Sequence, residues 1–501
     1  MKKLNLTPVG ELGFIVFFLG VLPIVLLFFL ILSATNHHFT YSLDDPYIHL
    51  ALAKNIALGH YGINSNEVSA PSSSILWPFL LAPFARWRLF EYTPLFINSI
   101  CLSALLYYLN KLFLEKGFCL RLLLISVVLL SVNAYGLVFT GMEHSLQILL
   151  VCIIAVSITA LRNEGDTNNR PAVVPNYTYV AIILLTLVRY EGLAIALPVL
   201  AYLYFKGDQK RAIISLLVLL VCMLGFSGYL YSLNLGLLPS SVLAKSSHSS
   251  FNSILDNLLR NIDKYGFMLL PVSLLCSYYW LKDFALALLI FFATLLHFML
   301  GKFGWFGRFE PYWVLFILLF GYHSLQHKII ASFISVIALL TLPLAFWSLL
   351  LCTLNTPLAA ANIYNQQAQT AKIAEILAEP VAVNDLGLVA LRSNQYVLDL
   401  YGLGNLEALK LRQFSQGSGW IDGLMKKHAV KYAFIFDQWF PEKPANWIRV
   451  AELKVINRGE LIPWDTVAFY AVDEQSKLKL GDAIRKFSSS AHAEFFSITQ
   501  Y

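Results

Sequence analysis

Long runs of apolar residues recur through the first two-thirds of the chain and constrain its fold more than any other feature. A helix that crosses a bilayer needs roughly 20 such residues, so the runs predict about eleven membrane-spanning helices. They lie near residues 11–33, 92–110, 121–139, 143–161, 177–189, 190–205, 212–233, 265–281, 284–300, 311–325 and 329–352. Only 13% of the 501 residues are charged, against about 25% in soluble domains. We therefore predict an all-α polytopic membrane domain.

The basic residues give this domain an orientation. Lys and Arg gather in short loops between the apolar runs, beginning with Lys2 and Lys3. Cytoplasmic loops carry such an excess, so we expect a cytoplasmic N-terminus. The net charge of +6 follows from this topology, and we expect no nucleic-acid partner.

One apolar stretch, 177–205, is too long for one upright helix and carries Arg189 and Glu191 near its middle. A single span would place its two basic flanks on opposite sides of the membrane, whereas a hairpin of two half-length helices keeps both inside. We favour the hairpin, with Arg189 and Glu191 at its tip. The odd number of spans then places the C-terminus outside.

The composition divides the chain into two domains. Residues 1–352 form the membrane domain, with a large first outside loop at 34–91. This loop contains a helix at 46–58 and an apolar segment at 75–85 that we expect to lie along the membrane surface. Residues 353–501 are more polar, with an amphipathic helix near 362–378. Five alternating segments typical of strands follow it: VAVND, YVLDL, YAFIF, WIRVAEL and DTVAFYAV. We predict a small α/β extracytoplasmic domain there.

Ionisable residues at the edges of apolar runs are functional candidates, because lipid stabilises them poorly. The predicted topology places eight of them on the outside: Asp44, Asp45, Glu143, Arg189, Glu191, Lys245, Arg308 and Glu310. His49 lies one helical turn after the acidic pair. None of the six cysteines or eleven histidines has metal-ligand spacing, so we expect no metal and no cofactor.

Each candidate also has a structural interpretation. Asp45 fits the N-cap of a helix that Pro46 could begin. Lys245 and Arg308 could extend toward lipid headgroups. Glu143 could complement a helix dipole, and Arg189 and Glu191 could pair with each other for stability alone. The functional interpretation is that these groups form one polar site, in which a carboxylate acts as a general base and the cations bind a phosphate.

Six motifs occur in a characteristic order. The segment DDPYIHLALAKNIALGHYGIN (44–64) pairs two acids with a helix and a glycine turn. The other five are TGME (140–143), RYEG (189–192), LPSSVLAK (238–245), RFEP (308–311) and VNDLGLVALRSNQYVLDLYGLGN (383–405). Together they resemble the GT-C superfamily of polyprenyl-phosphate-dependent glycosyltransferases, especially the bacterial branch of terminal arabinofuranosyltransferases. The resemblance extends over roughly residues 40–440. Ser240–Ser241 and Pro46 depart from the family pattern.

The resemblance implies an enzyme of the bacterial inner membrane with a periplasmic C-terminal domain. Such an enzyme transfers a sugar from a polyprenyl-phosphate donor to a hydroxyl of a glycan, lipid-linked or protein acceptor, with inversion. Asp44, or else Asp45, would be the base, and Lys245 and Arg308 would hold the donor phosphate. Glu143, Arg189, Glu191 and His49 would position the substrates.

A transporter or flippase of a lipid-linked or anionic substrate is the main alternative, since it would also have many spans and buried charges. Transporters place such charges at mid-membrane on broken helices. Here the charges gather at one face beside a large outside loop, which favours the enzyme.

Overall fold

The structure is a computed structural model that describes residues 8–164, 174–245, 251–325, 347–415, 417–456, 462–490 and 495–501. The chain forms two compact units. The first unit contains Met1–Leu26, Pro94–Gly225 and His248–Asn355, and the second contains Leu27–Thr93, Phe226–Ser247 and Thr356–Tyr501. The sequence division at residue 352 leaves the first outside loop with the membrane domain, whereas in the structure this loop packs on the C-terminal domain. Each unit is described by itself.

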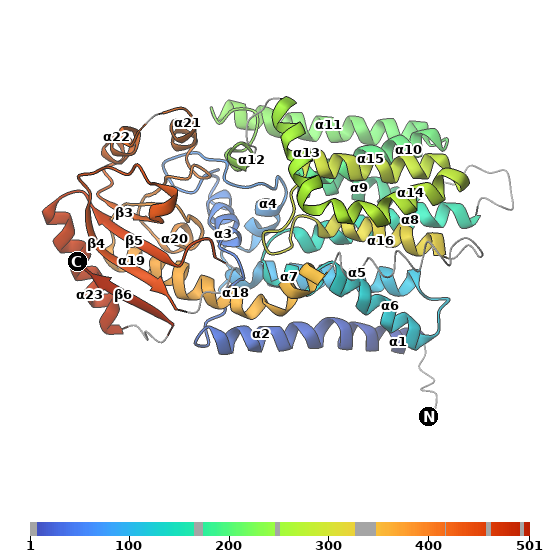
Figure 1. The fold of residues 1–501 in the computed structure, drawn as a ribbon, viewed down its shortest axis with the longest axis horizontal. Helices are drawn as coiled ribbons and strands as arrows, with labels where there is room; N and C mark the ends of the chain where they lie inside the picture. The colour runs from blue at the N-terminus through green and yellow to red at the C-terminus, as the bar shows by residue number, and fades with distance from the viewer. Residues whose placement is uncertain are drawn as a thin grey trace. The chain divides into compact units, whose positions relative to one another are not determined.

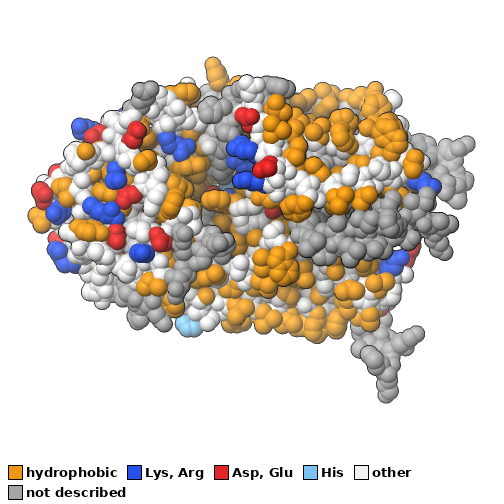
Figure 2. Space-filling model, in the orientation of Figure 1, with side chains coloured by type: hydrophobic (Ala, Val, Ile, Leu, Met, Phe, Trp, Pro, Cys, Tyr) orange, Lys and Arg blue, Asp and Glu red, His pale blue; other side chains and the backbone are white. Residues whose placement is uncertain are grey.

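The first unit is a helical bundle (Figure 1). Its helices are α1 (Pro8–Val16), the π-helix η1 (Phe17–Val21), α5 (Thr93–Leu112), α6 (Phe118–Ser131), α7 (Ala134–Phe139), α8 (His144–Glu164), α9 (Asn176–Val188), η4 (Tyr190–Gly192), α10 (Leu193–Phe205), α11 (Gln209–Ser232), α13 (Phe251–Tyr265), η5 (Gly266–Met268), α14 (Leu269–Lys282), α15 (Phe284–Leu300) and α16 (Pro311–Leu325). Hydrophobic side chains cover much of its visible surface (Figure 2), as expected of helices that face lipid.

The prediction of about eleven membrane-spanning helices is too high for the part of the chain that the structure describes. Four helical stretches there are long and apolar enough to cross a membrane: Val9–Ala34, Phe90–Leu112, His144–Leu161 and Gln209–Ser232. Four other apolar helices have only 10–17 residues. At about 1.5 Å per residue these are shorter than the roughly 30 Å hydrocarbon core. The predicted span 329–352 lies mostly outside the described residues.

Specific residues interrupt some predicted spans. The run 121–139 divides into α6 and α7 at Asn133, whose φ is 51°, a conformation that Asn adopts more readily than most residues. The Asn133 amide group donates to the carbonyl oxygen of Phe306 (3.0 Å) and accepts from the Thr353 hydroxyl (2.9 Å). The run 121–139 therefore forms two helices separated at Asn133, instead of the one continuous helix expected from the sequence.

The hairpin predicted at 177–205 is confirmed. Helices α9 and α10 each have 13 residues and flank the short turn η4. The Tyr179 hydroxyl, near the start of α9, donates to Asp208 (2.6 Å), just past the end of α10. Arg211 donates to the carbonyl oxygen of Val174 (2.9 Å). The two outer ends therefore lie together, and the chain reverses at Arg189–Gly192.

The second unit is built on a mixed six-stranded sheet of order β2-β1-β3-β5-β4-β6. The strands are β1 (Val381–Val383), β2 (Val397–Asp399), β3 (Tyr432–Ile435), β4 (Ile448–Val455), β5 (Thr466–Ala471) and β6 (Phe496–Gln500). Strand β1 is parallel to β2 and β3, and the remaining pairs are antiparallel. The first five strands confirm the predicted α/β domain, while β6 was not predicted from the sequence.

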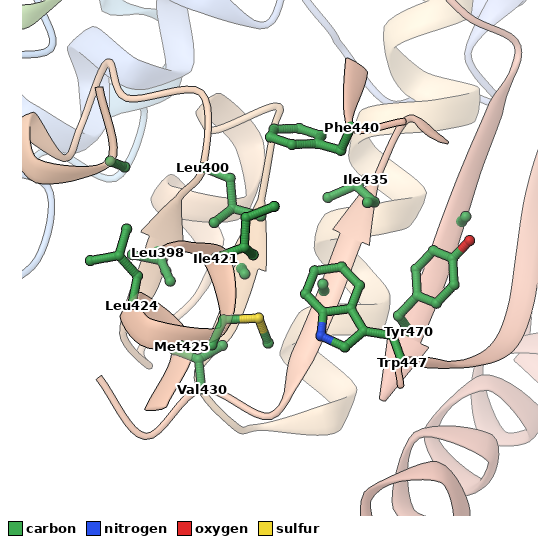
Figure 3. Packing of buried hydrophobic residues seen from close by; sticks show 14 residues of the cluster. Leu398, Leu400, Ile421, Leu424, Met425, Val430, Ile435, Phe440, Trp447 and Tyr470 are labelled. Atoms are coloured by element: carbon green, nitrogen blue, oxygen red, sulfur yellow. The ribbon is translucent and has the colours of Figure 1, made fainter. Parts of the chain in front are cut away.

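Helices cover both faces of this sheet. The C-terminal helices are α18 (Thr356–Ile363), η6 (Tyr364–Ala368), α19 (Gln369–Leu377), α20 (Gly387–Arg392), α21 (Leu406–Phe414), α22 (Gly419–Lys427), η7 (Asp437–Trp439) and α23 (Glu474–Ser490). Figure 3 shows the core in which Ile421 and Met425 of α22 pack against Ile435 of β3. Phe434 faces the opposite side of the sheet, as the two-residue period of a strand requires. Helix α23 packs against β4 and β5.

The first outside loop and the LPSSVLAK segment complete the second unit. The helix predicted at 46–58 is α3 (Asp45–Ile56), and the apolar segment 75–85 contains α4 (Trp77–Leu81) and η2 (Ala82–Phe84). The 3-10 turn η3 (Phe90–Tyr92) and α12 (Ser240–Lys245) also belong here. The long helix that begins with α1 enters this unit through α2 (Leu22–Ala34).

Candidate functional site

Asp44 joins the first outside loop to the C-terminal domain. It precedes the first residue of α3, but its carboxylate caps a different helix. One carboxylate oxygen accepts from the backbone N–H of Gly387 (2.7 Å), and the other accepts from that of Leu388 (2.9 Å). These N–H groups begin α20 and lack helical partners, so a carboxylate satisfies them well. Both oxygens of Asp44 are thus engaged by backbone donors.

Gly387 is required for this close approach. A Cβ atom at residue 387 would lie 2.1 Å from the backbone oxygen of Asp44 and 2.6 Å from its Oδ2. Real Cβ atoms do not approach backbone oxygens so closely, and the backbone cannot yield as a flexible side chain can. Gly387, in the VNDLG segment, therefore lets α20 approach the loop.

Three carboxyl groups gather at this contact. Asp385 accepts from the Gln367 side-chain amide (2.8 Å), and Asp44 and Asp45 both lie within its electrostatic reach. Burial raises the pKa of Asp44 well above 3.8, and the nearby Asp385 raises it further, while the two backbone N–H groups oppose the shift. Burial also raises the pKa of Asp385.

A small cavity adjoins these groups. It has a volume of about 10 Å³, which is close to the room that one water molecule needs. Its polar lining consists of Asp44, Gln366, Gln367, Thr370, Asn384 and Asp385. A cavity of this size and polarity can hold a water molecule beside the acids, but not a sugar.

Asp45 and His49 lie on the same side of α3, one turn apart. Asp45 is partly exposed, whereas His49 is buried with 3% of its surface accessible. The Nδ1 atom of His49 lies 3.2 Å from the Ser72 hydroxyl. The imidazole is thus held within the protein, while the Asp45 side chain reaches the surface.

Further contacts join the segments of the second unit. Asn64 pairs with the backbone of Val397 through both its amide nitrogen (3.0 Å) and its amide oxygen (2.9 Å). The Ser240 hydroxyl lies 2.9 Å from the carbonyl oxygen of Ala70 and 2.5 Å from that of Leu403. Three resemblance segments, 44–64, 238–245 and 383–405, therefore meet within one unit.

Arg189 is the centre of a second cluster, in the helical unit. Its Nη1 donates to Glu143 (2.7 Å), while its Nε and Nη2 donate to the two oxygens of Glu191 (3.1 and 2.8 Å). Arg189 and Glu143 are 2% and 0% exposed. The start of α8 and the tip of the hairpin are thus held together by one guanidinium group.

Arg308 lies beside this cluster. Its guanidinium group lies 4.9 Å from the Phe309 ring centroid, and that of Arg189 lies 5.5 Å from the same centroid. Arg308 also directs Nη1 toward the Met142 sulfur (2.9 Å). Glu310 accepts from the backbone N–H of Gly304 (3.0 Å). TGME, RYEG and RFEP therefore meet at one end of the bundle.

The predicted residues therefore form two groups in the described structure. Asp44, Asp45 and His49 belong to the second unit, and Glu143, Arg189, Glu191 and Arg308 belong to the first. The Lys245 side chain lies outside the described residues. The expected meeting of the acidic pair with the phosphate-binding cations stays a prediction.

Asp385, Gly387 and Gln367 were not predicted from the sequence as site residues. The D-x-G pattern of VNDLG was recognised only as part of the resemblance, because nothing local indicates that its acid and glycine contact residue 44. Among the described residues, no group of three or more His, Cys, Asp or Glu is arranged to hold a metal ion.

Comparison with known proteins gave three results. Residues 361–472 match a family model described as a domain of unknown function (DUF8728). The Archaeoglobus fulgidus oligosaccharyltransferase structure with Zn and sulfate is similar at a TM-score of 0.44 and 10% identity, over 90% of this chain and 73% of that chain. Its apo form gives 0.42 and 11%, over 91% and 74%. No curated protein matches. Such low identities and TM-scores assign no activity to this chain.

Proposed function

We propose that this chain is a membrane glycosyltransferase. It moves a sugar from a polyprenyl-phosphate donor to an acceptor hydroxyl on the extracytoplasmic side, with inversion, and Asp45 is the general base. The proposal rests on the six ordered motifs and on the division of roles within the acidic pair. It places the enzyme in a bacterial inner membrane, with its C-terminal domain in the periplasm.

The observation that carries the choice of base is the bonding of the Asp44 carboxylate. Asp44 accepts a backbone hydrogen bond at each oxygen, so it is suited to holding the loop in place. Asp44 and Asp45 are both partly exposed. A base must reach its substrate proton at about 2.6–3.2 Å, and because each oxygen of Asp44 already accepts a backbone N–H, we assign the base to Asp45.

The proposed step is a single displacement. The acceptor hydroxyl gives its proton to the Asp45 carboxylate, and its oxygen forms a bond to the anomeric carbon. The bond from that carbon to the phosphate oxygen breaks, and polyprenyl phosphate leaves with the electron pair. Cations that bind the leaving phosphate stabilise the transition state, and we assign this role to Lys245 and Arg308.

The remaining predicted residues have positioning roles in this proposal. His49 is buried below Asp45 in α3 and orients the first turn through Ser72. The ion pairs of Arg189 with Glu143 and Glu191 hold the TGME and RYEG segments together near Arg308. We assign no catalytic contact to these four residues.

A transporter is less well supported. Its substrate site would be expected on broken helices within the membrane, but the break between α9 and α10 reverses the chain. The charged residues there lie at the tip of a hairpin and are paired with each other.

Transfer of a labelled sugar from a polyprenyl-phosphate donor, measured with the purified full chain in nanodiscs, tests the proposal. Asp45→Asn should lower turnover by about 10²–10⁴-fold, the usual contribution of a general base. Asp482→Asn is the matched control, because that carboxylate is 71% exposed in the C-terminal domain.

The outcome depends on both variants. Full turnover by Asp45→Asn would remove the proposed base. Equal losses in Asp45→Asn and Asp482→Asn would show a general fault of folding or charge. Absence of transfer by the wild-type chain from pentosyl and hexosyl donors alike, with substrate movement across the membrane instead, would favour the transporter.

A further inference from the structure

A large cavity in the second unit has no role in the chemistry described above. Its volume is about 830 Å³, within the roughly 300–1,000 Å³ that is usual for ligand sites. Its walls are supplied by residues 37–41 after α2, helix α3, residues 85–92, helix α19 and helix α20. All of these segments belong to the same unit.

Aromatic rings form part of its lining. Trp87 and Tyr92 line the cavity and are 48% and 36% exposed. Tyr92 is held by stacking on Phe39, with centroids 5.1 Å apart and planes 23° from parallel. Fixed, exposed rings offer apolar faces against which the C–H face of a sugar ring can pack, while their edges remain near water.

Basic side chains dominate the charge of the lining. Four cations and two carboxylates line the cavity: Lys54, Arg88, Lys372, Arg392, Glu91 and Glu375. Arg392 pairs with Glu91 at 2.8 Å. Among the residues with described side chains, no ion pair involves Lys54, Arg88 or Lys372. The lining therefore has surplus positive charge, and its arginines can bind a carboxylate or phosphate through two hydrogen bonds.

Two residues that bind Asp44 also line the cavity. Tyr47 and Leu388 both line it. The backbone N–H of Leu388 donates to the Asp44 carboxylate (2.9 Å), and that of Tyr47 donates to the Asp44 backbone oxygen (3.1 Å). A chain of sugars in the cavity would thus extend close to the first turn of α3.

We propose that this cavity binds an anionic saccharide, and that this saccharide is the acceptor. The identification as acceptor rests on the proposed function, whereas binding itself does not. Exposed rings suit sugar faces, the surplus of cations suits carboxylate or phosphate substituents, and the volume suits more than one sugar unit. An anionic lipid headgroup would satisfy the cations, but it would leave the two exposed rings without a sugar face to contact.

Binding to the purified full chain in phosphatidylcholine nanodiscs is the direct test. The probes are trigalacturonate and the uncharged galactotriose, compared by calorimetry. We expect tighter binding of the anionic trimer and a loss of about tenfold or more in Trp87→Ala and in Arg88→Gln, the size typical of one well-made contact. The controls are Trp305→Ala, 55% exposed in the other unit, and Arg485→Gln, 63% exposed on α23.

Three results would overturn the inference. They are equal affinity for the two trimers, unchanged binding in both cavity variants, or a loss that the controls share. Binding only to phosphatidylglycerol vesicles, with none to the trimers, would identify a lipid site instead.

Kinetics separate this inference from the proposed function. If both hold, Trp87→Ala and Arg88→Gln raise the KM for an anionic acceptor and leave slow donor hydrolysis by water unchanged, while Asp45→Asn loses both reactions. Saccharide binding without any transfer would contradict only the glycosyltransferase proposal. Transfer whose acceptor KM is insensitive to both cavity variants would contradict only the acceptor site.

Discussion

The carboxylate of Asp44 accepts a 2.7 Å hydrogen bond from the backbone N–H of Gly387, a residue 343 positions further along the chain. This bond joins the first outside loop to the start of a helix in the C-terminal domain. Asp44 is the residue that the sequence favours as the base, and both of its carboxylate oxygens accept backbone N–H groups of α20. The neighbouring Asp45 begins α3 in the same unit.

Gly387→Ala should weaken the second unit. The added Cβ would lie 2.1 Å from the Asp44 backbone oxygen, so α20 must move away, at about 1–3 kcal/mol, as is typical for overpacking. We expect a lower Tm and faster proteolysis within 34–93. Gly423→Ala in α22 is the control, because its Cβ meets nothing within 4 Å, and Ala stabilises a helix interior by about 0.5–1 kcal/mol. Equal Tm values for the wild-type chain and Gly387→Ala would contradict the close approach.

The stability of the second unit should fall as the pH rises. Burial raises the folded-state pKa values of Asp44 and Asp385 above the ordinary 3.8. A group whose pKa is raised on folding contributes its full stability below the unfolded-state pKa, and this contribution is lost as the pH rises through the folded-state pKa. Thermal unfolding measured from about pH 4 to about pH 8 should therefore show a declining Tm.

Asp385→Asn provides the matched variant for this pH dependence. The asparagine oxygen can still accept the Gln367 amide hydrogen bond, but the neighbouring negative charge that raises the pKa of Asp44 is gone. The decline in Tm should be shallower in this variant. A wild-type Tm that rises with pH over the same interval would show that the backbone donors, rather than burial, dominate the Asp44 carboxyl group.

Arg189→Ala should strongly destabilise the helical unit. It leaves the Glu143 carboxylate buried at 0% exposure without the guanidinium group 2.7 Å away, and breaking a buried pair in this way costs about 3–5 kcal/mol. Thermal stability in detergent, measured by fluorescence-detected chromatography, reports the loss. Adding Glu143→Gln should restore part of it, since the orphaned charge is then removed. If the double variant is no more stable than Arg189→Ala, the pair is not the source of the effect.

The reversal between α9 and α10 predicts a labelling pattern. In a chain with its native cysteines replaced, cysteines at Tyr177 and Gln209 should react with a membrane-impermeant maleimide from the same side. A cysteine at Tyr190, in the turn between the helices, should react from the other side. Opposite sidedness of Tyr177 and Gln209 would mean a single crossing, in conflict with the contact between Tyr179 and Asp208.

Several features followed from the sequence because they depend on local patterns. Apolar runs located most of the helices, and their basic flanks indicated the hairpin at 177–205, which the structure confirms. Two-residue alternation located five of the six strands. The motif TGME and the hairpin tip were both expected at one face, and Arg189 does contact Glu143.

Other features depended on contacts between distant segments. The number of full-length spans was overestimated, because hydropathy does not register a break such as the left-handed Asn133, which distant carbonyl groups stabilise. The sequence favoured Asp44 over Asp45 as the base and suggested Asp45 as a helix N-cap, whereas in the structure Asp44 precedes α3 and its carboxylate caps α20. Only the folded chain brings the backbone N–H groups of α20 to the carboxylate of Asp44. Hydrogen bonding acts over a few ångströms in space irrespective of sequence separation, so this contact depended on the tertiary structure.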